Sequence, residues 1–299
     1  MNSLVLNSLV LNGGKGSGDH GHAGRPGKRG GSAPKGAAGR SSGSQEESKI
    51  AWGGDVKFGS EAFQKAVAEV SSSMEKEYGV ALDKTRVLKQ NVMESYYGNF
   101  GAGVVGRCKM NGTGKIDVSF RDREANLEDM EKRENDRYNT DSSVKGTIRH
   151  ELGHAIIGQL AQKATANIEV DYAPIKDENA NEAYRYINLC LANVARETAK
   201  KTGMNISKYS RKDPEEKFAG MSEYAIYNGD MEIVAESLSN PNYSAITKAV
   251  SNEVKELSKR ISNGNFKDMK EFYRGTFSAN NISSKAIDLC VGYRTRSET

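Results

Sequence analysis

The sequence contains no apolar run that approaches the ~20 residues needed to cross a membrane, so we expect no membrane span. Cysteine is also scarce, with three residues in 299. Because Cys108, Cys190 and Cys290 are odd in number and widely spaced, they exclude a disulfide framework and a cysteine-based zinc site. A secretory signal is missing as well, since Met1–Asn12 lacks a basic segment and Asn7 interrupts its apolar residues. We therefore expect the protein to be made in the cytoplasm.

Excess positive charge is confined to the start of the chain. Residues 1–50 carry seven Lys and Arg against three acidic residues, a net charge of +4, which equals that of the whole chain. Residues 51–299 are therefore balanced, which excludes a generally basic nucleic-acid-binding domain, and we expect no specific nucleic acid partner. The first segment also holds 12 of the 31 glycines and almost no apolar residue after Leu11. We predict a disordered Gly-rich basic tail over residues 1–50 and a folded domain over residues 51–299.

Hydrophobic spacing after the tail predicts helices combined with a small sheet. Ser60 is suited to cap a helix that runs to about Tyr78. Ser142 or Ser143 is suited to cap a long apolar helix through Gln162. We expect extended segments at Arg86–Val92, Gly103–Lys109 and Lys115–Phe120, and two later helices at Lys176–Lys201 and Asn240–Ile261. The predicted class is α+β, with a small antiparallel or mixed sheet and a helical C-terminal half.

The long apolar helix carries a motif with metal chemistry. It contains His150-Glu151-Leu152-Gly153-His154, an H-E-x-x-H motif that uses two of the four histidines in the chain. Histidines at i and i+4 share a helix face about one turn apart, so both imidazoles can reach one zinc ion. Glu151 can accept a proton from a water that the zinc activates. Two alternatives stay open: a pair of core histidines without metal, and a metal-binding protein that does not catalyse.

A zinc site of this kind needs a third protein ligand. No histidine follows His154, so we expect a downstream carboxylate. The best candidates are Glu232 and Glu236, which lie at i and i+4 among apolar residues and can project from one side of a helix. Two acidic groups in an apolar setting repel each other unless a cation or a hydrogen-bond donor neutralises them. From spacing alone either glutamate can be the ligand, and a surface helix is the alternative to a site.

These segments together resemble a known family. His150–His154 with Ser222–Glu236 is similar to the gluzincin metallopeptidases, which include the catalytic domain of anthrax lethal factor and many phage-encoded zincins. In that family HE(F/L)GHA is followed by SYA-x-x-N and then E-x-x-AE. The chain departs from this pattern because Glu223 follows Ser222, and because the step from Asn228 to Glu232 is one residue longer. The resemblance implies a zincin-like metallopeptidase domain over residues 51–299.

The resemblance also implies a role for each matching residue. His150, His154 and Glu232 match the three zinc ligands of the family, and Glu236 matches a second carboxylate that orients a ligand histidine. Glu151 matches the general base.

Tyr224 matches a tyrosine that stabilises the oxyanion. In zincins the strand before the motif helix is a sheet edge that aligns an extended peptide substrate, and Lys115–Phe120 is the candidate here, with an ordinary half-buried strand as the alternative. The implied activity is a zinc-dependent endopeptidase that hydrolyses peptide bonds by a zinc-activated water.

The tail contains a second resemblance. The segment His20–Ser32 is similar to a GHxGRPGxxGGS segment of many phage head-morphogenesis and phage-encoded polyvalent proteins. It implies a protein encoded by a phage or mobile element, with phage capsid components as partners besides a protein or peptide substrate, and carriage in a phage particle. The alternative function is a structural or binding component of the phage particle that keeps a non-catalytic zinc site. A toxin-like effector is a further option within the enzyme class.

Overall fold

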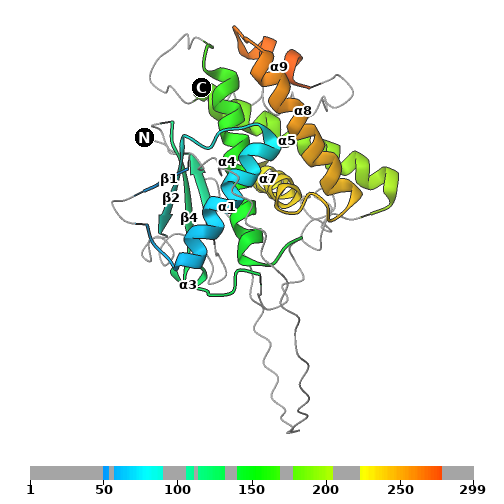
Figure 1. The fold of residues 1–299 in the computed structure, drawn as a ribbon. Helices are drawn as coiled ribbons and strands as arrows, with labels where there is room; N and C mark the ends of the chain where they lie inside the picture. Colours follow the sequence, from blue (N-terminus) through cyan, green and yellow to red (C-terminus); the bar gives the residue numbers. More distant parts are fainter. Residues whose placement is uncertain are drawn as a thin grey trace, which may run out of the picture.

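The computed structural model has a small sheet on one side of a group of helices (Figure 1). It describes residues 50–53, 57–89, 106–110, 114–131, 140–168, 178–204 and 223–277. Within these ranges the chain forms seven helices and a four-stranded mixed sheet, which confirms the α+β class. No helix in these ranges combines the length and the apolar character of a membrane span. Residues 1–49 of the predicted tail lie outside the described residues.

The sheet has the strand order β1-β2-β4-β3. Its strands are β1 (Ala51–Trp52), β2 (Thr85–Lys89), β3 (Gly106–Met110) and β4 (Ile116–Phe120). Strands β1 and β4 run parallel to β2, whereas β3 runs antiparallel to β4. The three extended segments expected from the sequence are confirmed within the described residues. Strand β1 was not predicted, because its two residues are too few to show a periodic pattern.

The expectation that Lys115–Phe120 forms an exposed edge of the sheet is wrong. Strand β4 lies between β2 and β3, so it is an interior strand. The Arg86 guanidinium on β2 donates to both carboxylate oxygens of Asp117, at 2.8 and 2.9 Å, which accounts for the polar side chain on an interior strand. Alternating polarity tells which face a side chain occupies but not which strand lies alongside. Among the described strands, the outer neighbour of β4 is β3.

Helix α1 (Glu61–Tyr78) packs across the sheet and the central helix. Ser60 caps it as predicted, since its hydroxyl accepts a hydrogen bond from the Phe63 amide at 3.1 Å. The helix ends at Gly79, whose φ of 65° is a left-handed conformation that glycine adopts without strain. The predicted apolar face is buried, and the Phe63 ring meets the edge of the Phe120 ring from β4 at a centroid distance of 5.4 Å. Helix α1 is thereby joined to the sheet.

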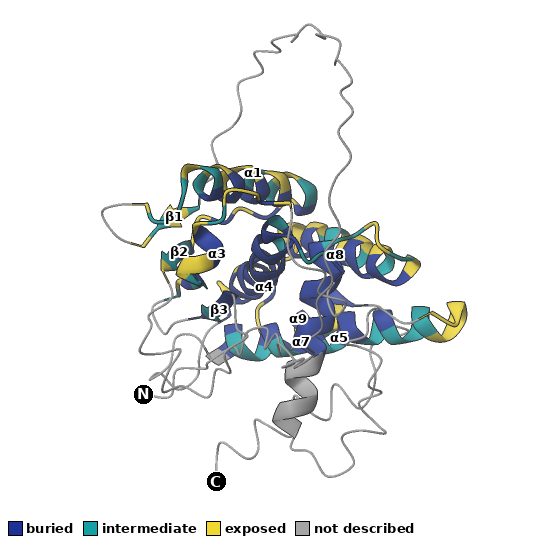
Figure 2. Cartoon of the chain, turned by 90° about the horizontal axis from the view of Figure 1, so that it is seen from below, coloured by how far each residue is buried: buried dark blue, intermediate teal, exposed yellow. Residues whose placement is uncertain are grey.

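Helix α4 (Val144–Thr165) runs through the middle of the molecule, and 19 of its 22 residues are buried (Figure 2). The sheet and α1 lie on one side of it, and the later helices cover the other (Figure 1). A helix covered on all sides is expected to be apolar around its whole circumference. Helix α4 departs from this expectation, because His150, Glu151 and His154 lie in the interior, where polar groups need partners.

Of the remaining helices, one short helix follows the sheet and the others form the C-terminal half of the described chain. They are the short α3 (Asp122–Ala125), which follows the sheet, and then α5 (Glu178–Thr202), α7 (Glu223–Ser239), α8 (Ala245–Asn263) and α9 (Met269–Thr276). Helix α5 confirms the expectation for Lys176–Lys201. The helix expected from Asn240 begins later, at Ala245, because Pro241 lies in a turn and Ser244 forms a reciprocal cap with Thr247.

Helix α7 is held against α4 at close range. A Cβ atom added at Gly153 of α4 would lie 3.3 Å from Leu238 Cβ and 3.5 Å from the Ala235 Cα, so glycine allows the two helices to approach. The Arg149 side chain of α4 donates to the backbone oxygen of Ser239 at 2.8 Å. These contacts place α7 along the face of α4 that carries the H-E-x-x-H motif.

We predict that Ser143, and not Ser142, caps α4. The Ser143 hydroxyl accepts a hydrogen bond from the Gly146 amide at 2.8 Å. Ser143→Ala should therefore lower the free energy of unfolding by about 1 kcal/mol, measured by denaturant titration. Ser142→Ala is the matched control and should change it by no more than about 0.5 kcal/mol. An equal loss in both variants would contradict the assignment of the cap.

Candidate metal centre

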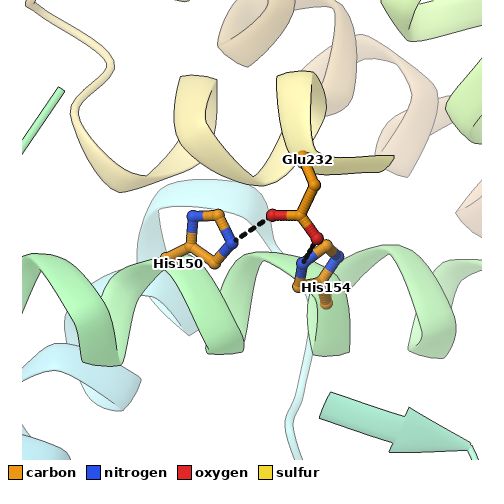
Figure 3. Close-up of side chains that lie close together, drawn as sticks. All are labelled: His150, His154 and Glu232. Atoms are coloured by element: carbon orange, nitrogen blue, oxygen red, sulfur yellow. Dashed lines mark hydrogen bonds and ion pairs between the residues drawn. The ribbon is translucent and has the colours of Figure 1, made fainter. Parts of the chain in front are cut away.

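Helix α4 presents the two motif histidines side by side. His150 and His154 lie one turn apart, with ring centroids 5.0 Å from each other and rings inclined by 79°. Both side chains are buried, at 2% and 4% exposure. Figure 3 shows them on the same face of α4, below α7. The i, i+4 spacing therefore acts as the sequence predicts, and it brings two imidazoles to one point in the interior.

Glu232 reaches down from α7 between the two imidazoles (Figure 3). Its Oε2 atom lies 3.0 Å from His150 Nε2, and its Oε1 atom lies 3.7 Å from His154 Nε2. Ligand atoms of His150, His154 and Glu232 all lie within 4.8 Å of one another, and all three residues are buried. This cluster, which we call the His-His-Glu cluster, could hold a metal ion. It consists of the three residues that the resemblance implies as ligands.

Glu236 lies one turn further along α7 and contacts the opposite side of the His150 ring. Its Oε1 atom is 3.0 Å from His150 Nδ1. Its Oε2 atom accepts hydrogen bonds from the Thr140 amide at 2.8 Å and from the Thr140 hydroxyl at 3.0 Å. The structure therefore separates the two glutamates that spacing alone left equivalent. Glu232 faces both Nε2 atoms, whereas Glu236 holds the outer nitrogen of one ring.

The charge state of His150 follows from these two carboxylates. Burial by itself lowers the pKa of the imidazole, because it disfavours the charged form. The hydrogen bonds to Glu232 and Glu236 outweigh burial and hold the pKa of His150 well above its ordinary value. In the metal-free protein the ring is therefore a cation that neutralises part of the negative charge of the two glutamates. A bound metal ion supplies that positive charge instead.

Glu151 is a buried carboxylate between α4 and the sheet. It is fully buried, and neither of its oxygens has a hydrogen-bond partner within the described residues. A Cβ atom at Gly106 of β3 would lie 2.7 Å from Glu151 Cγ and Oε1, so the strand passes directly over the side chain. The pKa of Glu151 is raised to about 8, chiefly by burial; the positive charge of His150 opposes this shift and the charge of Glu232 adds to it. An unpartnered group of this kind is unusual in a core.

The two ring nitrogens of His154 have different surroundings. Its Nδ1 atom lies 3.4 Å from the hydroxyl oxygen of Tyr184 on α5. Its Nε2 atom is buried without a hydrogen-bond partner among the described residues. Burial lowers the pKa of His154 to about 4, so the ring is neutral near pH 7. A neutral imidazole with a free lone pair is the form that binds metal ions.

Two residues next to the cluster were not identified from the sequence. Thr140 precedes the motif helix and binds Glu236, and nothing in its local pattern indicates that contact. Tyr184 lies in the helix expected at Lys176–Lys201, for which no contact with the motif was predicted. A chemical argument could have pointed to a polar contact of Tyr184, because a buried tyrosine usually finds a hydrogen-bond partner for its hydroxyl.

Tyr224 lies in the first turn of α7, and its side chain falls outside the described part of the structure. Its expected role beside the cluster therefore stays a prediction. The described part brings together His150, Glu151, His154 and the two glutamates.

No model of a known protein family matches the chain, and neither the curated proteins nor the solved structures contain a significant match.

We predict that the two glutamates of α7 differ sharply in their effect on metal binding. Glu232→Gln should nearly abolish binding, because the amide is a poor ligand between the two Nε2 atoms. Glu236→Gln should weaken binding by about 10–100-fold, because it acts through the His150 ring. The measurement is a competition titration of the metal-free protein with Zn²⁺ and, in parallel, with Co²⁺.

The matched control for these variants is Glu182→Gln, on α5. Glu182 accepts a hydrogen bond from the Tyr273 hydroxyl and belongs to no part of the cluster. Its replacement should leave the affinity unchanged within about twofold, well below the 10–100-fold effect of an outer partner. If Glu236→Gln loses the metal and Glu232→Gln keeps it, the two roles are reversed.

Proposed function

We propose that the protein is a zinc-dependent endopeptidase that hydrolyses peptide bonds with Glu151 as the general base. The observation that carries the proposal is the placement of one unpartnered buried carboxylate beside the His-His-Glu cluster. A site that only stabilised the fold would need the three ligands but not Glu151. The alternative of a structural zinc site in a phage particle leaves this costly buried group without a role.

The donor set favours zinc over other common metal ions. Two imidazoles and one carboxylate suit zinc, whereas calcium and magnesium prefer oxygen ligands throughout. In a tetrahedral zinc site with bonds of about 2.0–2.2 Å, two ligand atoms lie about 3.3 Å apart. Glu232 directs Oε2 to His150 Nε2 at 3.0 Å and Oε1 to His154 Nε2 at 3.7 Å, so each imidazole faces one carboxylate oxygen at a separation close to that value.

Zinc in such a site supplies a Lewis acid that polarises the scissile carbonyl and lowers the pKa of water towards ~7. Glu151 provides the proton acceptor. Because its carboxylate accepts no hydrogen bond within the described residues, both oxygens remain available to take a proton from water and return it to the leaving amine. With a pKa of about 8, the ionised form of Glu151 is a stronger proton acceptor than an exposed glutamate, and the fraction in that form grows as the pH rises towards 8.

The outer partners of His150 fix the direction of its ring. Glu236 holds Nδ1, and the amide and hydroxyl of Thr140 in turn hold Glu236. The Thr140 hydroxyl also donates to the backbone oxygen of Glu236 at 3.0 Å, so the carboxylate and its helix are positioned by the same residue. Such carboxylate–histidine pairs set the tautomer of the ligand and increase its basicity.

Strand β3 provides the surface for an extended substrate in this proposal. It has a neighbour on one side among the described strands, namely β4. It also passes over Glu151 at Gly106, so a peptide paired along its outer side would run next to the base. The substrate class is a protein or peptide segment without regular structure at the cleavage point. We further propose, from the resemblances in the motif and the tail, a phage or mobile-element protein that acts during assembly, entry or host interference.

We predict that Glu151→Gln keeps the metal and loses the activity. The amide has nearly the same shape as the carboxylate but cannot accept a proton, and loss of a general base costs about 10²–10⁴-fold in rate. The measurement compares zinc content and cleavage of a denatured proteome peptide library by the wild type and the variant. Turnover at the wild-type rate by a zinc-loaded Glu151→Gln protein would remove Glu151 from the mechanism.

We also predict that Gly106→Ala impairs cleavage while metal affinity is retained. The added methyl group would lie 2.7 Å from Glu151 Cγ and Oε1 and displace the base, and its three nearest atoms all belong to Glu151 and not to the His-His-Glu cluster. A displacement of about 1 Å can cost about 10²-fold in rate. Cleavage rate and zinc affinity are measured on the same preparations.

Gly158→Ala is the matched control for this crowding. Its methyl group would lie 2.8 Å from Ile116 Cδ1, so it strains the contact between α4 and the sheet without touching Glu151. We expect it to lower thermal stability and to keep the cleavage rate per folded molecule. Equal loss of activity in both glycine variants would indicate a general packing effect and contradict a specific role of Gly106.

A further inference from the structure

We propose that Tyr184 is a positioning residue that holds His154 in the orientation that binds the metal. The inference rests on the proposed metal centre and assigns the outer partner of its second histidine. Tyr184 belongs to α5, a helix that contributes no member of the His-His-Glu cluster. Its hydroxyl oxygen lies 3.4 Å from His154 Nδ1, and both side chains are buried.

The two histidines of the cluster have outer partners of different chemistry. His150 Nδ1 meets the carboxylate of Glu236, whereas His154 Nδ1 meets a neutral phenol. When Nε2 binds a metal ion, Nδ1 of a neutral ring must carry the hydrogen. That N–H donates to the Tyr184 oxygen, which selects the required tautomer and keeps Nε2 directed toward Glu232. Without the phenol oxygen a buried N–H would lose its acceptor.

The charge balance of the cluster explains why a neutral partner suits this place. Three buried glutamates, Glu151, Glu232 and Glu236, already surround the histidines. A divalent ion offsets the charges of Glu232 and Glu236, the two carboxylates in contact with His150, so a further carboxylate beside His154 would add repulsion that burial strengthens. A phenol accepts the hydrogen bond and adds no charge. Tyr184 is fully buried, so it also orients the ring by packing.

The test uses two tyrosines of the same helix. Tyr184→Phe removes the oxygen next to His154 and keeps the aromatic ring. Tyr186→Phe is the matched control, because Tyr186 is equally buried and its hydroxyl donates to the Tyr273 backbone oxygen at 3.1 Å. The full-length proteins are prepared free of metal and titrated with Zn²⁺ against a chelator of known affinity. The absorption spectrum of each protein is then recorded with Co²⁺.

We expect Tyr184→Phe to weaken Zn²⁺ affinity by about 10–100-fold and to change the Co²⁺ spectrum. Tyr186→Phe should leave the affinity within about twofold of the wild type and the spectrum unchanged, because the Tyr186 hydroxyl donates to the Tyr273 backbone oxygen and has no role as an outer partner of a metal ligand in this proposal. Each variant loses a hydrogen bond of its tyrosine hydroxyl. The melting temperatures of the two metal-free variants therefore show whether the loss of stability is the same in both. Wild-type affinity and spectrum in a folded Tyr184→Phe protein would overturn the inference and leave the proposed function intact.

Nuclear magnetic resonance of the wild type tests the same point without a variant. With ¹⁵N-labelled histidine and bound Zn²⁺, His154 should show a protonated, slowly exchanging Nδ1 and a metal-bound Nε2. A metal-bound Nδ1, or an Nδ1–H that exchanges rapidly with solvent, would overturn the inference even if Tyr184→Phe does not fold. A wild-type protein that binds no Zn²⁺ would overturn the proposed function and this inference together, and is thus distinguishable from failure of the tyrosine alone.

Discussion

The burial of α4 on all sides is the constraint on which the rest of the site depends. A central helix that carries two histidines and a glutamate must satisfy them from its neighbours, because solvent does not reach them. Helix α7 supplies Glu232 and Glu236 as partners of His150, and α5 supplies Tyr184 as a partner of His154. Glu151 is left without a partner among the described residues. The described residues thus bring together three groups that could hold a metal ion and leave one carboxylate beside them without a partner, at the place where the proposed mechanism needs a water.

The surrounding contacts keep α7 at the required distance from α4. Gly153 allows close approach of the two backbones, and Arg149 ties the end of α7 to the middle of α4. An ion pair between Arg196 of α5 and the buried Asp230 holds α7 two residues before Glu232. The Arg149 guanidinium also donates to Glu77 of α1 at 3.0 Å, so helices from both halves of the chain share the support. Residues held in such a frame would need little reorganisation to bind the proposed ion, which favours affinity.

Local patterns predicted the parts of the site that depend on one helix at a time. The i, i+4 spacing of His150 and His154 and of Glu232 and Glu236 follows from helix geometry, so the sequence sufficed for both pairs. Which glutamate faces both imidazoles depends on how α7 lies on α4, and only the structure separates them. Thr140 and Tyr184 reach the cluster through contacts across 96 and 30 residues, which leave no local trace. The prediction that β4 is an edge strand was wrong for the same reason, since the alternating polarity of β4 does not show which strands lie beside it.

The central claim is that the His-His-Glu cluster is a zinc centre, and X-ray absorption at the zinc edge of the zinc-loaded full chain tests it most directly. The account predicts one tightly bound ion with two imidazole nitrogens and carboxylate oxygen at about 2.0–2.2 Å and no sulfur. A sulfur neighbour at about 2.3 Å would place the ion at a cysteine instead. That result, or a shell with a single imidazole, would contradict the account.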